Sequence, residues 1–328
     1  MKTNTMLRKL GSTELMVSPI GLGTWQFSKR KNLAGKFWSA LTDEESYQII
    51  KASYESGINW FDTAELYGNG ESEKTLSRAL KKAGITDDDV IVATKWSPFF
   101  RFADSIIKTI DKRQGALNGY TISLHQVHNP MSFSSISKEM AAMAKLSDQG
   151  KIKYVGVSNF SAEQMRKAYH ELARYGYSLA SNQVQYNLLN RKIERNKILE
   201  TAKELGIAII AYSPLAQGIL TGKYHDNPDQ IKTKKGFRKR MSAFRRSNLE
   251  KTNPVVEILK DIAEKHNATP AQVALNWLVN FHNEQVFAIP GASNVNQAKS
   301  NAKAIHLKLT NEEMQTIDIT SSKLNEPK

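Results

Sequence analysis

The chain has 328 residues, of which 46 are Lys or Arg and 32 are Asp or Glu, so its formal net charge is +14, and it contains no cysteine. The absence of cysteine excludes disulfide bonds, thiolate nucleophiles and cysteine-ligated zinc, and is typical of a reducing compartment. The longest apolar runs are the size of a strand, far below the ~20 residues that cross a bilayer, so we expect a cytoplasmic protein without membrane contacts.

Much of the positive charge lies in one segment, from Lys232 to Arg246, where eight of fifteen residues are Lys or Arg and none is acidic. No recognition-helix, zinc-finger or RNA-binding signature accompanies this charge, so nucleic acid is not expected as a partner. A basic loop of this kind could hold a phosphorylated cofactor, and it could equally be an undistinguished loop. The pattern leaves both interpretations open.

Short apolar runs alternate with helix-like stretches after a small hairpin expected over Leu7 to Ser18. Most spacings between the expected strand ends are close to the roughly thirty residues of one strand–helix unit. Eight units predict a TIM-type (β/α)8 barrel with an N-terminal β-hairpin and an extra C-terminal helix, as a single domain over residues 1–328. The alternative, an open doubly wound sheet, lacks its Gly-x-Gly-x-x-Gly motif. The expected strand ends are Gly23, Asp62, Lys95, His128, Ser158, Gln185, Ser213 and Pro290.

Helix start signals lie between several of these strands. Thr42 precedes three acidic residues, and Thr269 precedes a proline at the first helical position; both patterns are typical of helix N-termini. Thr310 and Glu313 have the spacing of a capping box. The expected helices span Thr42 to Gly57, Ser161 to Gly176, Arg195 to Leu205, Pro254 to His266, Ala271 to Phe281 and Thr310 to Ile319.

Ionisable side chains end three consecutive expected strands. Asp62 ends the second strand, Tyr67 follows it in a glycine-bounded loop, and Lys95 and His128 end the next two strands. A capped turn would explain Asp62 and Tyr67 taken alone. However, the carboxyl ends of barrel strands meet at one mouth, and charge gathered there is typical of a catalytic site.

These four residue types suit the protonation of an oxygen on which negative charge develops. A neighbouring ammonium such as Lys95 would lower the pKa of Tyr67 from its reference value of about 10, and Asp62 would pair with that ammonium. A neutral His128 could orient a carbonyl oxygen. Because the side chains offer no electrons, addition of hydride to a carbonyl would require a hydride-donating cofactor. No metal-ligand cluster is evident, so no metal is expected.

Several short motifs occur in order along nearly the whole chain: Phe61-Asp62-Thr63-Ala64 with Tyr67-Gly68, Ala93-Thr94-Lys95, Gln126-Val127-His128-Asn129-Pro130, Gly156-Val157-Ser158-Asn159-Phe160 and Tyr212-Ser213-Pro214-Leu215. This ordered set resembles the aldo-keto reductase superfamily, whose members are eight-stranded α/β barrels that reduce carbonyls with NADPH. The resemblance implies a catalytic tetrad of Asp62, Tyr67, Lys95 and His128. It assigns Tyr67 as the general acid, Lys95 as the group that tunes it, Asp62 as the partner of Lys95, and His128 as the residue that positions the carbonyl.

The resemblance also implies a cofactor site. Ser158, Asn159 and Gln183 match contacts to the nicotinamide carboxamide, and Tyr212 matches the residue that stacks on the nicotinamide ring. Substrate contacts are expected from Trp25, Tyr67, Trp96 and His128, with Phe160 as a further candidate for an aromatic wall. The residues expected to contact the cofactor are Gly23, Thr24, Trp25, Asp62, Ser158, Asn159, Gln183, Tyr212, Ser213, Pro214, Leu215, Gln217, Gly218, Lys223, Arg238, Pro290, Gly291, Ala292, Ser293, Asn294, Gln297 and Asn301.

The segment from Ile289 to Asn294, followed by Gln297 and Asn301, resembles the same segment in a branch of the superfamily that includes potassium-channel β-subunits and bacterial oxidoreductases. Gly291 and Gln297 stand where other members have the Lys and Arg typical of NADP preference, and Ser300 replaces an acid that meets the adenine. We still expect NADPH/NADP+, with NADH less favoured, because Lys or Arg from the basic loop could serve. The alternative function is a cofactor-binding regulatory or redox-sensing subunit with little turnover. The physiological carbonyl substrate and any oligomeric state stay open.

Overall fold

Eight parallel strands form the centre of the protein, for which a computed structural model describes residues 6–29, 40–231 and 241–325. Each strand pairs with the next along the chain, from β3 to β10. Parallel bridges from Ile20 to Ala288 and from Gly23 to Gly291 join the first strand to the last and close the barrel. The strands are β3 (Leu22–Gly23), β4 (Trp60–Asp62), β5 (Ile91–Trp96), β6 (Ile122–Val127), β7 (Tyr154–Ser158), β8 (Leu179–Gln185), β9 (Ala208–Tyr212) and β10 (Val286–Ala288).

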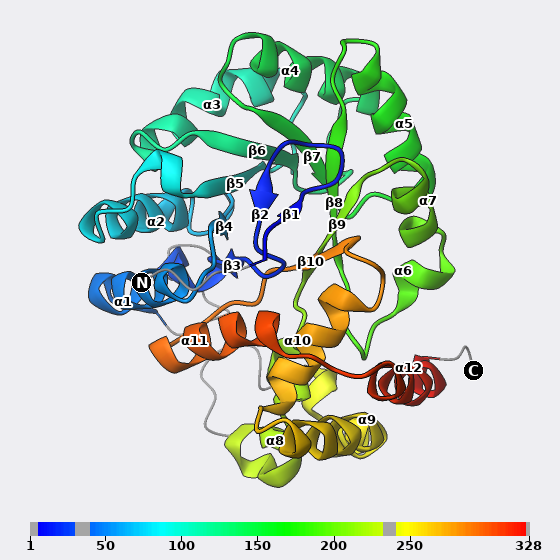
Figure 1. Ribbon diagram of the computed structural model, residues 1–328. Coiled ribbons are helices and arrows are strands. Elements are labelled where there is room, and N and C mark those ends of the chain that lie inside the picture. Colours follow the sequence, from blue (N-terminus) through cyan, green and yellow to red (C-terminus); the bar gives the residue numbers. More distant parts are fainter. Residues whose placement is uncertain (1–5, 30–39, 232–240, 326–328) are drawn as a thin grey trace.

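Helices surround the strands, as Figure 1 shows, and the apolar core lies between the two layers. The strands are buried over most of their length, as expected for a parallel sheet covered by helices. Among the described residues, no helix is both long and apolar enough to cross a membrane. The helices are α1 (Asp43–Glu55), α2 (Glu71–Lys82), α3 (Asp104–Leu117), α4 (Ile136–Asp148), α5 (Ala162–Ala173), α6 (Lys192–Arg195), α7 (Ile198–Glu204), α8 (Lys223–Asp226), α9 (Arg246–Lys265), α10 (Pro270–Asn280), α11 (Val295–Lys303) and α12 (Asn311–Asn325).

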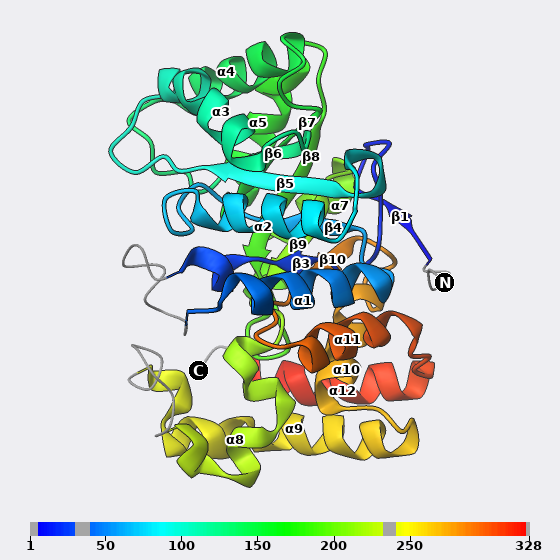
Figure 2. The same cartoon turned by 90° about the vertical axis from the view of Figure 1, so that its left-hand side faces the viewer.

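The expected N-terminal hairpin is present and covers one end of the barrel (Figure 2). Its strands β1 (Arg8–Lys9) and β2 (Met16–Val17) pair antiparallel. The tip approaches the barrel so closely that a Cβ atom on Gly11 would lie 2.6 Å from the carbonyl oxygen of Ala180, which requires glycine there. The indole of Trp60 donates to the carbonyl of Ser18 over 2.8 Å. The N-terminal hairpin therefore packs against this end of the barrel and closes it.

Three of the expected helix boundaries differ from the structure. The helix expected from Arg195 to Leu205 is α7, which begins only at Ile198, because Arg195 ends α6 and Lys197 has a left-handed backbone (φ 63°). Pro254 lies inside α9 instead of starting it. Buried Leu249, on the preceding turns, packs in a local apolar cluster with Tyr224 and Phe244, so tertiary packing outweighs the hydrogen bond that proline removes.

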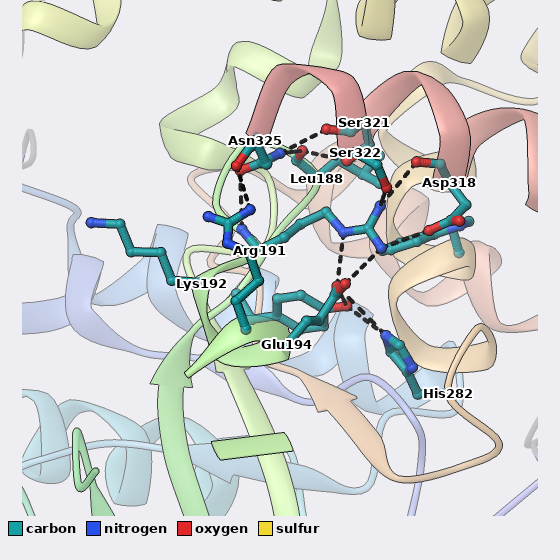
Figure 3. Close-up of polar contacts among 12 residues, drawn as sticks. Leu188, Arg191, Lys192, Glu194, His282, Asp318, Ser321, Ser322 and Asn325 are labelled. Carbon is teal, nitrogen blue, oxygen red and sulfur yellow. Dashed lines mark hydrogen bonds and ion pairs between the residues drawn. The ribbon is translucent and has the colours of Figure 1, made fainter. Parts of the chain in front are cut away.

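The third boundary concerns α12, which continues six residues past the expected end at Ile319. Figure 3 shows why: the buried guanidinium of Arg191 binds the carboxylate of Glu194 at 2.7 Å and that of Asp318 in α12 at 2.6 Å. Three residues after Asp318, Ser321 donates to the carbonyl of Leu188 over 2.6 Å. These contacts tie the last helix to the segment that follows β8.

Candidate active site

The four residues of the expected tetrad lie together at the carboxyl ends of β4, β5 and β6. Asp62 ends β4, Lys95 is the last residue but one of β5, and His128 follows β6 directly. Lys95 Nζ is 2.5 Å from Asp62 Oδ1 and 5.1 Å from the centroid of the Tyr67 ring. The rings of Tyr67 and His128 meet edge to face with centroids 5.8 Å apart. One mouth of the barrel thus collects all four side chains.

The Asp62 carboxylate is the hub of this group. In addition to Lys95, it accepts hydrogen bonds from the side-chain amides of Gln183 at 2.8 Å and Gln126 at 3.2 Å. Lys95 donates a second bond, of 2.9 Å, to the carbonyl of Thr63. A buried ion pair is stable only when its remaining hydrogen-bonding positions are occupied, and these contacts meet that need. Sequence reasoning gave Gln126 no role, although its inward strand position, two residues before His128, was a usable signal.

Burial and neighbouring groups shift the pKa values of Tyr67, Lys95 and His128. Burial raises the pKa of Tyr67, and the positive charge of Lys95 offsets only part of that rise, so the phenol stays protonated at neutral pH. The expected lowering by Lys95 is therefore smaller than the effect of burial. Burial also lowers the pKa of Lys95, but Asp62 and Tyr67 outweigh this and hold it above its usual value. Burial and the charge of Lys95 lower the pKa of His128 to about 3, which keeps its imidazole neutral.

A cavity of about 950 Å³ opens at this mouth. Asp62, Tyr67 and His128 line it, whereas Lys95 is fully buried beneath them. Nearly all the residues expected to contact a cofactor line the same cavity: Gly23, Thr24, Trp25, Ser158, Asn159, Gln183, Tyr212, Ser213, Pro214, Leu215, Gln217, Gly218, Lys223, Pro290, Gly291, Ser293, Asn294, Gln297 and Asn301.

Besides Lys95, three of the residues expected at the site do not line the cavity. Trp96, expected to contact substrate, is buried in the core, and its indole donates to the Ser105 hydroxyl at 3.0 Å. It follows Lys95 in the strand and so points to the opposite face of the sheet. Phe160 and Ala292 are also buried in the core. Arg238 lies outside the described residues.

Trp25 lines the cavity beside Tyr67. Its ring stacks on that of Tyr67 with centroids 6.1 Å apart and an interplanar angle of 25°. Next to it, the side chain of Gln26 covers Gly291 so closely that a Cβ atom there would lie 1.8 Å from the Gln26 amide nitrogen. The neighbouring Gln26 therefore also lines the cavity, and sequence reasoning did not identify it.

Hydrogen bonds fix the polar side of the cavity next to the tetrad. The Tyr212 hydroxyl donates to Asn159 Oδ1 at 3.0 Å, and Asn159 Nδ2 donates to the carbonyl of His128 at 3.2 Å. The Ser158 hydroxyl donates to the carbonyl of Gln183 at 2.9 Å. These bonds link the ends of β6, β7, β8 and β9 into one wall of the cavity.

Comparison with known proteins agrees with this geometry. The sequence profile described as "Aldo/keto reductase family" matches residues 19–321. The chain is 34% identical to aldo-keto reductase str7 of Strobilurus tenacellus over 94% of this chain and 90% of that protein, and 32% identical to the chloroplastic pyridoxal reductase of Arabidopsis thaliana over 93% and 84%. The solved structure of glycerol dehydrogenase AKR11B4 from Gluconobacter oxydans superposes with a TM-score of 0.81 at 28% identity, covering 98% of this chain and 96% of that one. The chain belongs to the aldo/keto reductase family.

Proposed function

We propose that the protein reduces an aldehyde or ketone to an alcohol in a reversible reaction, with NADPH as hydride donor and Tyr67 as proton donor. The observation that carries this proposal is the grouping of Tyr67, His128 and the Asp62–Lys95 pair at one end of a large cavity. A reduced nicotinamide, when bound, supplies the hydride to the carbonyl carbon. The side chains of the protein supply the proton and hold the carbonyl oxygen.

The rest of the cavity suits an elongated phosphorylated cofactor. Its volume of about 950 Å³ is near the upper end of the range for ligand pockets. The loop after β9 has left-handed backbone at Ser213, Gln217 and Gly218, and such turns expose N–H groups that favour anions. Lys223 also lines the cavity and adds a positive charge. The N-terminus of α11, capped by Asn294, lies there too and adds the partial positive charge of a helix N-terminus.

Each member of the tetrad has a distinct role in the proposed step. The phenol of Tyr67 gives its proton to the carbonyl oxygen as negative charge develops there. The ammonium of Lys95 stabilises the phenolate that is left, and Asp62 keeps Lys95 charged and in place. The neutral imidazole of His128 donates a hydrogen bond to the same oxygen. Electrostatic groups fixed before the reaction are the usual main source of such catalysis.

The low pKa of His128 predicts how kcat/KM for aldehyde reduction depends on pH. Because this pKa is about 3 instead of 6.5, the imidazole is neutral throughout the range from pH 5 to 8. We expect kcat/KM for aldehyde reduction to show no inflection from His128 in that range. An inflection near pH 6.5 that disappears in His128→Gln would contradict the assignment.

Ligand protection tests the choice of cofactor. A ligand that binds only the folded state at 100 times its Kd stabilises that state by about 2.7 kcal/mol. We expect NADPH to raise the thermal unfolding midpoint more than NADH at equal concentrations. As a control for the 2′-phosphate, which NADPH has and NADH lacks, adenosine 2′,5′-bisphosphate should protect more than AMP. Equal or greater protection by NADH would overturn the preference.

Turnover tests the proposed reaction itself. The protein mixed with NADPH and a panel of aldehydes and ketones should consume NADPH. The panel should include pyridoxal, because a relative is named for its reduction. Protection by NADPH without consumption across the panel would instead favour a redox-sensing subunit.

A further inference from the structure

A group of ionisable side chains lies behind the tetrad and does not line the cavity. It consists of Glu65, Glu73, Arg101 and Arg113, which come from the turn after β4, from α2, from the loop after β5 and from α3. Both glutamates and Arg113 are less than 10% exposed. The mechanism described above uses none of them.

Glu65 connects the turn that carries Tyr67 to β5. Its carboxylate accepts hydrogen bonds of 2.5 Å from the backbone N–H of Ser97, from Arg101 and from Arg113. Its own backbone N–H donates to the carbonyl of Lys95 at 3.3 Å. Two residues before Tyr67, the chain is thus attached to the backbone of Lys95 and to that of Ser97, just beyond the end of β5.

A second connection reaches Lys95 from the outer face of the sheet. Arg113 Nε lies 3.0 Å from Glu73 Oε2, and Glu73 Oε1 accepts a 2.6 Å hydrogen bond from the hydroxyl of Thr94. Thr94 precedes Lys95, and side chains alternate between the two faces of a strand. The strand is therefore held outside the barrel through Thr94 and inside it through the Asp62–Lys95 pair.

Stability is a weak explanation for this arrangement. Replacement of buried ion pairs by apolar residues of similar volume is often neutral or stabilising, because desolvation of the charges is costly. Directional hydrogen bonds, in contrast, fix the position of the backbone that carries them. Here they fix the two segments whose side chains must meet at the proton-transfer site.

We propose that Glu65, through Arg113 and Glu73, is a positioning residue that sets the alignment of Tyr67 with Lys95. This inference rests on the proposed function. Misplacement by about 1 Å can cost about 10² in rate, so loss of the Glu65 contacts should be measurable in kcat.

The test compares Glu65→Gln with a matched control, Glu194→Gln. Glu194 is also a carboxylate that accepts several hydrogen bonds, from Arg191 and Tyr186, but it lies where α12 meets the segment after β8 (Figure 3). We expect kcat to fall about 10- to 100-fold in Glu65→Gln, consistent with the cost of misplacement, while NADPH protection is retained. Glu194→Gln should lower the unfolding midpoint without a change in kcat. Unchanged kcat in Glu65→Gln, or equal losses in both variants, would overturn the inference.

A second measurement is independent of turnover. In protein labelled with 3-fluorotyrosine, the Tyr67 resonance can be assigned by its absence in Tyr67→Phe. Glu65→Gln should shift this resonance and raise the pH at which Tyr67 titrates, because the phenolate loses its alignment with Lys95. An unchanged or lowered titration would overturn the positioning role. A shifted resonance in a protein that reduces no carbonyl would refute the proposed function and leave the positioning supported.

Discussion

Replacement of Tyr67 by Phe should lower kcat for carbonyl reduction by about 10²- to 10⁴-fold, the usual contribution of a general acid. The change removes only the hydroxyl, so the stacking on Trp25 and the shape of the cavity should persist. NADPH should therefore protect the variant against thermal unfolding as well as it protects the unaltered protein. Steady-state kinetics with a good aldehyde substrate, together with thermal unfolding, give both readouts.

Tyr120→Phe is the matched control for this experiment. Tyr120 also has a buried ring, and its hydroxyl donates to the carbonyl of Ile85 at 2.6 Å, away from the cavity. Loss of this hydroxyl should affect stability and leave kcat unchanged. If Tyr67→Phe kept full activity, the proton would come from another group, and the raised pKa of Tyr67 would have no catalytic role.

The barrel and the positions of the tetrad were predictable because they depend on periodicity. Strand–helix units of nearly constant length place Asp62, Lys95 and His128 at successive carboxyl ends, and the structure confirms this barrel. Local helix signals were equally informative: Thr42 and Thr269 are the N-caps of α1 and α10, at the helix starts that their sequences indicate. Both kinds of signal are local in the chain.

The features that the sequence did not predict depend on contacts between distant segments. Gln126 and Glu65 have important partners only because the barrel brings Gln126 of β6 to Asp62 of β4 and because α3 brings Arg113 behind the turn. The continuation of α9 through Pro254 depends on packing in the same way. Trp96 is a different case, because strand alternation alone would have assigned it to the core.

Replacement of Lys95 by Met should have the largest effect on stability. Lys95 and Asp62 are 0% and 1% exposed, and removal of one partner of a buried pair typically costs 3–5 kcal/mol because the other charge is left uncompensated. The amides of Gln126 and Gln183 remain on Asp62 and offset part of this cost. The free energy of unfolding should therefore fall by about 3 kcal/mol in urea titrations, near the lower end of that range. Catalysis should also fall, because no ammonium stabilises the phenolate.

The double variant Asp62→Asn/Lys95→Met decides whether this loss reflects the uncompensated charge. An asparagine in place of Asp62 removes the buried charge, so the double variant should be more stable than Lys95→Met alone, although it has lost one more native group. Lys82→Met breaks an ion pair with Glu44 in which both side chains are 57% exposed, and it should change the unfolding midpoint little. If the losses of unfolding free energy from the separate changes at residues 62 and 95 add up to the loss in the double variant, the two side chains have no coupling energy. The position of the Lys95 ammonium inside the barrel would then be fixed by the carbonyl of Thr63 instead of the Asp62 carboxylate.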